Sequence, residues 1–70
     1  FGLFTISVNF GIERNFSFKI TNPSGKTIYR KSDKTSENIY NIDMQRFPDG
    51  IYIISIKIDD VKLKRKIIKL

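Results

Sequence analysis

The stretch IYIISIKI, residues 51–58, has the strongest strand pattern in the chain. Its residues alternate between two faces, with Tyr52, Ile54, Ile56 and Ile58 on one and Ile51, Ile53, Ser55 and Lys57 on the other. This period of two predicts a β-strand, because successive side chains of a strand point to opposite faces. Both faces are apolar at the start of the stretch, and we therefore expect a central strand that is covered on two sides.

The next segment, residues 59–70, is predicted to complete a hairpin. Asp59-Asp60 fits a two-residue loop. The terminal strand that follows places Val61, Leu63 and Ile67 on one face. Arg65 interrupts this apolar set, which a bulge or an edge position in the sheet would explain.

The terminal strand is also strongly basic. Residues 61–70 contain no acidic side chain and five basic ones, namely Lys62, Lys64, Arg65, Lys66 and Lys69. Lysine on an exposed edge strand protects a sheet against edge-to-edge aggregation, so edge protection is one interpretation. Recognition by a partner, through strand addition or through charge, is the other.

The residues before the stretch also indicate strands joined by turns. Alternation predicts strands over residues 4–10, 16–20 and 27–31 and a weaker extended segment over residues 39–44. Between them we expect a polar turn over residues 11–15, a β-turn at Asn22-Pro23-Ser24-Gly25, a polar loop over residues 32–38 and a tight turn at Phe47-Pro48-Asp49-Gly50. No segment has a helical period. The pattern predicts an all-β domain of about six or seven strands, either a β-sandwich or a barrel.

Composition limits the size and class of the domain. The chain has 70 residues, of which 40% are hydrophobic, and a net charge of +6. This length suits one small domain near the lower limit for a self-sufficient core. No apolar run approaches the roughly 20 residues that span a bilayer, so we expect no direct membrane insertion. The chain begins in mid-pattern at Phe1-Gly2, and we expect that an opening strand or motif precedes it.

The residue types disfavour catalysis and metal binding. The chain has no Cys and no His. We expect the aspartates in the predicted turns to form hydrogen bonds with their own backbone rather than act in catalysis or bind calcium. These residues are Asp43, Asp49, Asp59 and Asp60. We therefore expect no catalytic residue, no metal site and no cofactor.

The basic charge raises the question of nucleic-acid binding. A protein that binds single strands needs exposed aromatic side chains beside its basic groups. The phenylalanines of the predicted strands fall on apolar faces, and we expect Phe4, Phe10, Phe16 and Phe18 to lie in the core. The sequence therefore favours partners other than nucleic acid.

Several short motifs follow one another along the chain. They are Gly2-x-Phe4-Thr5-Ile6, a Phe-x-Ile strand, Pro23-Ser24-Gly25-Lys26, Ile42-Asp43-Met44, Gly50-Ile51-Tyr52 and Lys66-Ile67-Ile68-Lys69. Their order and spacing, across essentially the whole chain, resemble the type A C-terminal sorting domain of the bacterial type IX secretion system. Three departures are the missing proline-asparagine-proline opening, Asn22, where the family usually has Asp, and Leu70 after the last lysine, which the family tolerates.

The resemblance implies a small Ig-like antiparallel β-sandwich and a non-enzymatic secretion signal. Such a domain transits the periplasm and targets a cargo protein, fused N-terminally, to outer-membrane components of the secretion system. These partners are the translocon and the shuttle and attachment proteins, and the cargo is then attached to the cell surface or released.

The motifs also indicate candidate residues. The expected partner-recognition residues are Gly50, Ile51, Tyr52, Lys64, Arg65, Lys66, Lys69 and Leu70, and the expected structural turn residues are Pro23, Gly25, Asp43, Pro48 and Gly50. Tyr52 is expected to bury its ring while its hydroxyl finds a partner. Met44 and Phe47 are expected to cover the core beside it.

An alternative function is adhesion or glycan binding by an Ig-like or fibronectin-like β-sandwich. That function predicts exposed aromatic side chains on one face or at loop tips. Tyr29 and Tyr40 are the candidates for such a platform.

Overall fold

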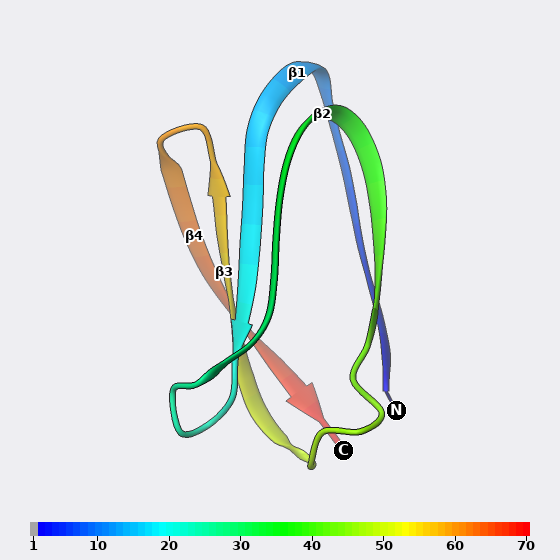
Figure 1. Ribbon diagram of the computed structural model, residues 1–70, viewed down its shortest axis with the longest axis vertical. Coiled ribbons are helices and arrows are strands. Elements are labelled where there is room, and N and C mark those ends of the chain that lie inside the picture. Colours follow the sequence, from blue (N-terminus) through cyan, green and yellow to red (C-terminus); the bar gives the residue numbers. More distant parts are fainter. Residues whose placement is uncertain (1) are drawn as a thin grey trace.

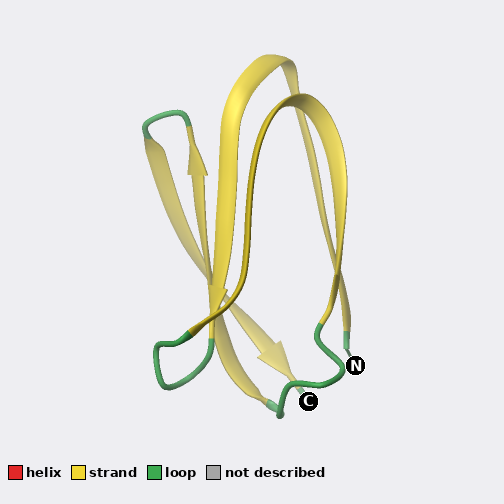
Figure 2. Cartoon of the chain, in the orientation of Figure 1, coloured by secondary structure: helices red, strands yellow, loops and turns green. Residues whose placement is uncertain are grey.

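A computed structural model describes residues 2–70, and these residues form four antiparallel strands in one sheet with no helix. The strands are β1 (Leu3–Thr21), β2 (Thr27–Asp43), β3 (Gly50–Ile58) and β4 (Val61–Lys69). Their order in the sheet is β2-β1-β3-β4 (Figure 1). Short loops connect them (Figure 2). The predicted all-β class is confirmed, whereas the structure has four strands in place of the expected six or seven.

The difference in strand number comes from a bend shared by β1 and β2. The two strands pair from Leu3↔Asp43 to Asn9↔Glu37, then shift register and resume at Arg14↔Thr35. Gly11 lies at this bend with a φ of 76°, a conformation that glycine adopts without strain. The polar segments 11–15 and 32–38 were expected to be a turn and a loop, and both expectations were wrong. They bend together as a ribbon, so neither strand is broken (Figure 1).

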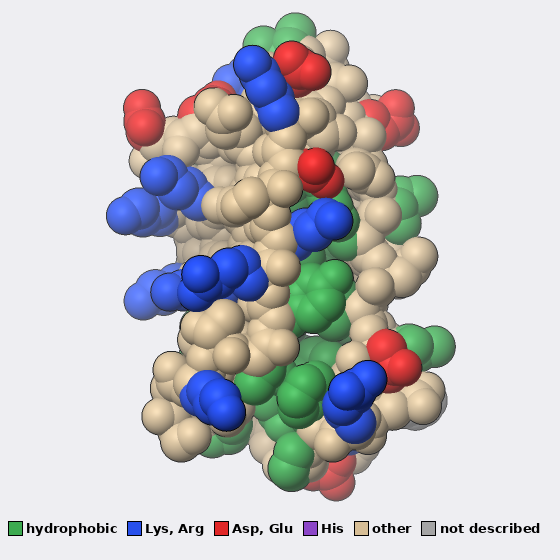
Figure 3. All heavy atoms as spheres, in the orientation of Figure 1, with side chains coloured by type: hydrophobic (Ala, Val, Ile, Leu, Met, Phe, Trp, Pro, Cys, Tyr) green, Lys and Arg blue, Asp and Glu red, His purple; other side chains and the backbone are tan. Residues whose placement is uncertain are grey.

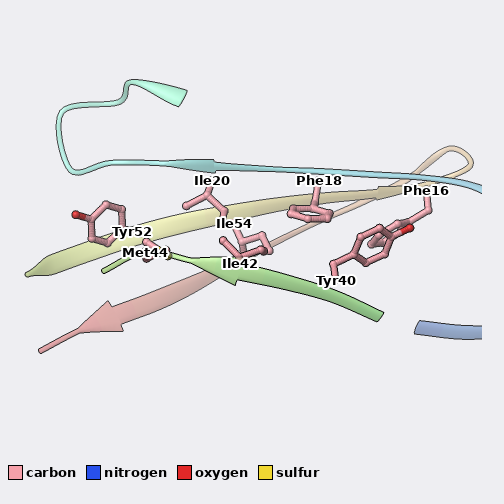
Figure 4. Close-up of a cluster of buried hydrophobic side chains, with 8 residues drawn as sticks. All are labelled: Phe16, Phe18, Ile20, Tyr40, Ile42, Met44, Tyr52 and Ile54. Carbon is pink, nitrogen blue, oxygen red and sulfur yellow. The ribbon is translucent and has the colours of Figure 1, made fainter. Parts of the chain in front are cut away.

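The bend folds the sheet over a single core. Buried side chains come from the second half of β1, the second half of β2 with the residue after it, and β3, and they are Phe16, Phe18, Ile20, Tyr40, Ile42, Met44, Tyr52 and Ile54 (Figure 4). Phe16 pairs in the sheet with Asp33, yet its ring stacks on that of Tyr40 with centroids 5.5 Å apart. Tyr40 therefore reaches Phe16 across the core, which confirms that the two halves of the ribbon face each other.

Strand β3 is central but is covered on one face. It lies between β1 and β4, which confirms the predicted central position. Tyr52 and Ile54 are buried, whereas Ile51 on the opposite face is 50% exposed. The expectation of cover on two sides was wrong, because the folded half of the sheet lies over the inner face alone.

The turns depend on short polar side chains. The side-chain carbonyl of Asn22 accepts hydrogen bonds from the backbone N–H groups of Ser24 and Lys26, and Gly25 adopts a φ of 90°. The carboxylate of Asp43 accepts one from the N–H of Gln45 at 2.9 Å, so its expected capping role is confirmed. The hydrogen-bonded turn after β2 runs from Met44 to Phe47, with a 3.0 Å bond, slightly earlier than predicted. Met44 is buried and Phe47 packs against the core, as expected.

Candidate recognition surface

The β3–β4 hairpin carries all the sequence-predicted recognition residues but Leu70, which follows β4. Its register runs without a shift from Gly50↔Lys69 to Ile58↔Val61, which leaves Asp59-Asp60 as the predicted two-residue loop. β4 is the edge of the sheet. Since β4 contains no bulge relative to β3, its edge position accounts for Arg65 within the apolar set.

The loop of this hairpin is fixed to the bend of β1. A carboxylate oxygen of Asp59 lies 2.9 Å from the guanidinium of Arg14, and the other accepts a hydrogen bond from the N–H of Asn15 at 3.1 Å. The hydrogen bonds from Arg14 and Asn15 lower the pKa of the Asp59 carboxyl below its ordinary value. Sequence reasoning missed this contact, because the partners lie 45 residues apart.

The other end of the hairpin depends on Gly50 and Tyr52. Tyr52 is 1% exposed, and its hydroxyl donates a hydrogen bond to the carbonyl of Pro48, so its predicted burial is confirmed. Gly50 has a φ of 156°, which side chains rarely adopt, and a Cβ there would lie 3.4 Å from Pro23. Both residues shape the hairpin base. Tyr52 has no accessible ring to offer a partner.

The basic residues of β4 divide between two faces. Lys64 and Lys66 pair with Ser55 and Ile53 on the face away from the core. Arg65 lies on the other face, and its guanidinium donates to the carbonyl of Lys64 at 2.8 Å. Lys69 is largely buried, with 13% of its side chain exposed, and lies 3.3 Å from Asp49. The structure thus leaves Lys64 and Lys66 available and engages Lys69 internally.

Apolar side chains remain exposed at the end of the same hairpin. Ile51 pairs with Ile68, and these two side chains are 50% and 63% exposed. Leu70 is 90% exposed. A partner that contacts this region would meet both aliphatic and cationic groups.

Three further basic residues, which sequence reasoning did not single out, lie on the same side of the sheet, and they are Lys19, Arg30 and Lys57. Lys57 pairs with Lys62, and Lys19 of β1 pairs with Arg30 of β2. Figure 3 shows Lys and Arg side chains projecting from the side of the molecule that carries β3 and β4. Strand alternation could have placed each of them on a polar face, but their grouping requires the sheet order.

The aromatic platform expected for a glycan-binding module is absent from residues 2–70. Tyr40 is buried, and its hydroxyl donates to Asp33 at 3.0 Å. Burial, reinforced by the nearby Asp33 carboxylate, raises the pKa of Tyr40. Tyr29 stacks on Phe18 with a centroid distance of 5.7 Å. The large hydrophobic side chains that are exposed in the described residues are all aliphatic.

No group of three or more His, Cys, Asp or Glu side chains within residues 2–70 could hold a metal ion. No helix long and apolar enough to cross a membrane occurs in that part of the chain.

Comparison with known proteins identifies one similarity. A family model described as the secretion system C-terminal sorting domain matches residues 2–70. No curated protein and no solved structure matches the chain.

Proposed function

Because this chain belongs to the family of type IX secretion C-terminal sorting domains, we propose that it is a non-enzymatic signal that targets an N-terminally fused cargo protein to the secretion machinery. The observation that carries the proposal is the family match over residues 2–70. The cargo passes through the periplasm and crosses the outer membrane through the translocon. It is then attached to the cell surface or released.

The proposed recognition surface is the free edge of β4 with the exposed residues beside it. An edge strand leaves one row of backbone N–H and C=O groups without a partner in the sheet. An extended segment of a secretion component can add to such an edge, with main-chain hydrogen bonds giving affinity. Lys64, Lys66, Ile51 and Leu70 are exposed around this edge and supply side-chain contacts.

Three of the predicted recognition residues take an indirect part in this proposal. Tyr52 is buried, Lys69 is paired with Asp49, and Gly50 has no side chain. They hold β3 and the end of β4 in the geometry that a partner meets. Arg65 lies at the edge on the inner face and can contact a partner that passes over it.

The folded sheet supports the Ig-like β-sandwich that the resemblance implies. Its two halves enclose one core, and the bend converts two long strands into four strand segments in two layers. We propose that these layers correspond to the two sheets of a small sandwich.

A reporter fusion tests the proposed function. Residues 1–70 are fused to the C-terminus of a fluorescent reporter that carries a signal for export to the periplasm, in a cell with a working type IX system. We expect the reporter at the cell surface or in the medium, and the reporter without the domain retained in the periplasm. Equal retention of both proteins would contradict the proposal.

A second pair of fusions tests the recognition surface. Deleting residues 61–70 removes β4 and should abolish export. Because this deletion also exposes β3, the matched variant keeps the fold and changes exposed residues alone, as Lys66→Gln with Leu70→Ser. Full export of both variants would exclude the terminal strand as the recognised surface.

A further inference from the structure

The side chains on the outer face of the sheet form rows across all four strands. In one row Arg30 pairs with Lys19, Lys19 with Ser55, and Ser55 with Lys64. In the next, Ser32 pairs with Ser17, Ser17 with Lys57, and Lys57 with Lys62. Residues directly opposite in a sheet share a face. We call this set, together with Lys66, the basic face.

The basic face carries charge of one sign. Its six cationic side chains are Lys19, Arg30, Lys57, Lys62, Lys64 and Lys66, and all are exposed. None of them takes part in the ion pairs found within residues 2–70, which join Arg14 to Asp59, Lys34 to Glu13 and Lys69 to Asp49. No acidic residue occupies a position in its rows. A surface that served solubility alone would intersperse both signs.

Edge protection accounts for only part of this charge. It explains lysine on β4, which is an edge strand. It does not explain Lys19 and Lys57, because β1 and β3 are paired on both sides. Moreover, Lys57 faces Lys62 directly and Lys19 faces Arg30, and like charges in these positions destabilise a sheet.

The basic face is hollowed and carries hydroxyl groups. An open hollow of about 490 Å³ is lined by residues of all four strands, among them Ser17, Ser32 and Ser55. Serine hydroxyls and lysine ammonium groups are both hydrogen-bond donors to carboxylates. The hollow therefore offers anionic oxygens several donors from different strands.

The side chains around the basic face indicate which kind of anionic partner it fits. The exposed large hydrophobic side chains of the described residues include no aromatic group on which a base could stack. Beyond Lys66 the same outer face continues into Ile53, Ile51 and Ile68, which are partly or largely exposed. An acidic protein surface presents carboxylates beside aliphatic side chains and so matches both parts of this face. Charge and apolar contact thus point to one class of partner.

We propose that the basic face is a docking surface for an acidic protein partner, with Ile51 and Ile68 contacting apolar residues that flank the partner's carboxylates. The inference rests on the proposed function, because it gives the chemistry of a secretion component that recognises this domain. Charge complementarity would steer the encounter, and the adjoining β4 edge would add main-chain contacts.

Calorimetric titration of the 70-residue chain tests the docking surface. The probes are an oligo-glutamate peptide, the same peptide flanked by leucines, and an oligothymidylate of equal charge. The variant Lys19→Gln/Lys57→Gln/Lys64→Gln removes three charges from the basic face, and Lys26→Gln/Lys34→Gln/Arg46→Gln removes three exposed charges elsewhere. Circular dichroism verifies that each variant is folded.

We expect the leucine-flanked peptide to bind most tightly. The basic-face variant should lose about tenfold in affinity, as follows from several exposed charge pairs of modest strength, and the control variant should stay close to the wild type. Ile51→Ser/Ile68→Ser should weaken the flanked peptide alone. Equal losses for the two charge variants, or tighter binding of the oligothymidylate, would overturn the inference.

Export is measured separately with the reporter fusion. If the domain directs export while the basic-face variant binds the peptides and exports cargo like the wild type, the docking surface is refuted and the proposed function stands. If the intact domain fails to direct export, the proposed function is refuted whatever the peptide affinities show.

Discussion

The guanidinium of Arg14 and the carboxylate of Asp59 lie 2.9 Å apart and join the loop of the terminal hairpin to the bend of the first strand. The N–H of Asp59 also donates to the carbonyl of Asn15 at 2.8 Å. The last residue pair between β1 and β3 at this end of the sheet is Phe16↔Ile58. The backbone hydrogen bond between Asp59 and Asn15 therefore continues the pairing of the two strands by one residue. These two contacts fix the position of the β3–β4 hairpin relative to the bent strands β1 and β2.

The Arg14–Asp59 pair should make stability depend on pH. The folded-state pKa of Asp59 is lowered from its ordinary value of 3.8, so the pair's contribution is present above that value and is lost as pH falls through the lower folded pKa. Asp59→Asn should therefore be less stable than the wild type at neutral pH, with a difference that shrinks below pH 3.8. Asn tolerates the φ of 51° at this position. Urea unfolding of both proteins across this range measures the effect, and an unchanging difference would contradict it.

Tyr52 should act through the fold rather than through contact with a partner. Tyr52→Phe removes the hydrogen bond to the Pro48 carbonyl and keeps the buried ring, and it should cost about 1–3 kcal/mol of unfolding free energy. Tyr52→Ala should cost more, about 3–5 kcal/mol, because it leaves a cavity in the core. We expect the Tyr52→Phe variant to support reporter export under conditions in which the variant is folded. Loss of export by a stably folded Phe variant would assign the hydroxyl to recognition.

Gly2 and Gly11 should respond differently to substitution. A Cβ at Gly2 would lie 2.8 Å from the Cα of Gln45, a backbone atom that cannot move aside cheaply. Gly2→Ala should therefore cost about 1–3 kcal/mol through overpacking. Gly11 has open space around it and a φ of 76°, which Asn tolerates, so Gly11→Asn should be nearly neutral. Thermal unfolding distinguishes the two, and a neutral Gly2→Ala would contradict the close approach.

The like charges of the basic face should lower stability in the absence of a partner. Lys57→Gln removes the direct opposition of Lys57 and Lys62 and should stabilise the domain by about 0.2–1 kcal/mol. Added salt should narrow the gap between the variant and the wild type, because it screens exposed charges. Denaturant unfolding at low and high salt measures both effects. A destabilised variant would show that Lys57 has a structural role on this face.

Local pattern predicted the hairpin and much of the core. Alternation placed Tyr52 and Ile54 on the same face of a strand, which is the buried face in the structure, and Asp59-Asp60 was identified as the loop after that strand. These features depend on residues that are close together in the sequence, so the alternation of apolar and polar residues is enough to predict them.

The folded ribbon and the basic face could not be predicted in the same way. Residues 11–15 and 32–38 are mostly polar, so they resemble connecting loops until the pairing of β1 with β2 is known. In the sequence Lys19 stands between two apolar residues and Arg30 stands beside Lys31, and only the sheet order brings Lys19 and Arg30 beside Lys57 and Lys64. Both features depend on which residues pair between strands that are far apart in the sequence.

The most direct test of the sorting function compares export of one reporter fusion in two isogenic strains. The fusion carries residues 1–70 at its C-terminus and a signal for export to the periplasm, and one strain lacks the type IX translocon. We predict that the reporter reaches the surface or the medium in the competent strain and stays in the periplasm of the other. Retention in both strains, or equal release from both, would contradict the assignment of this chain as a type IX sorting signal.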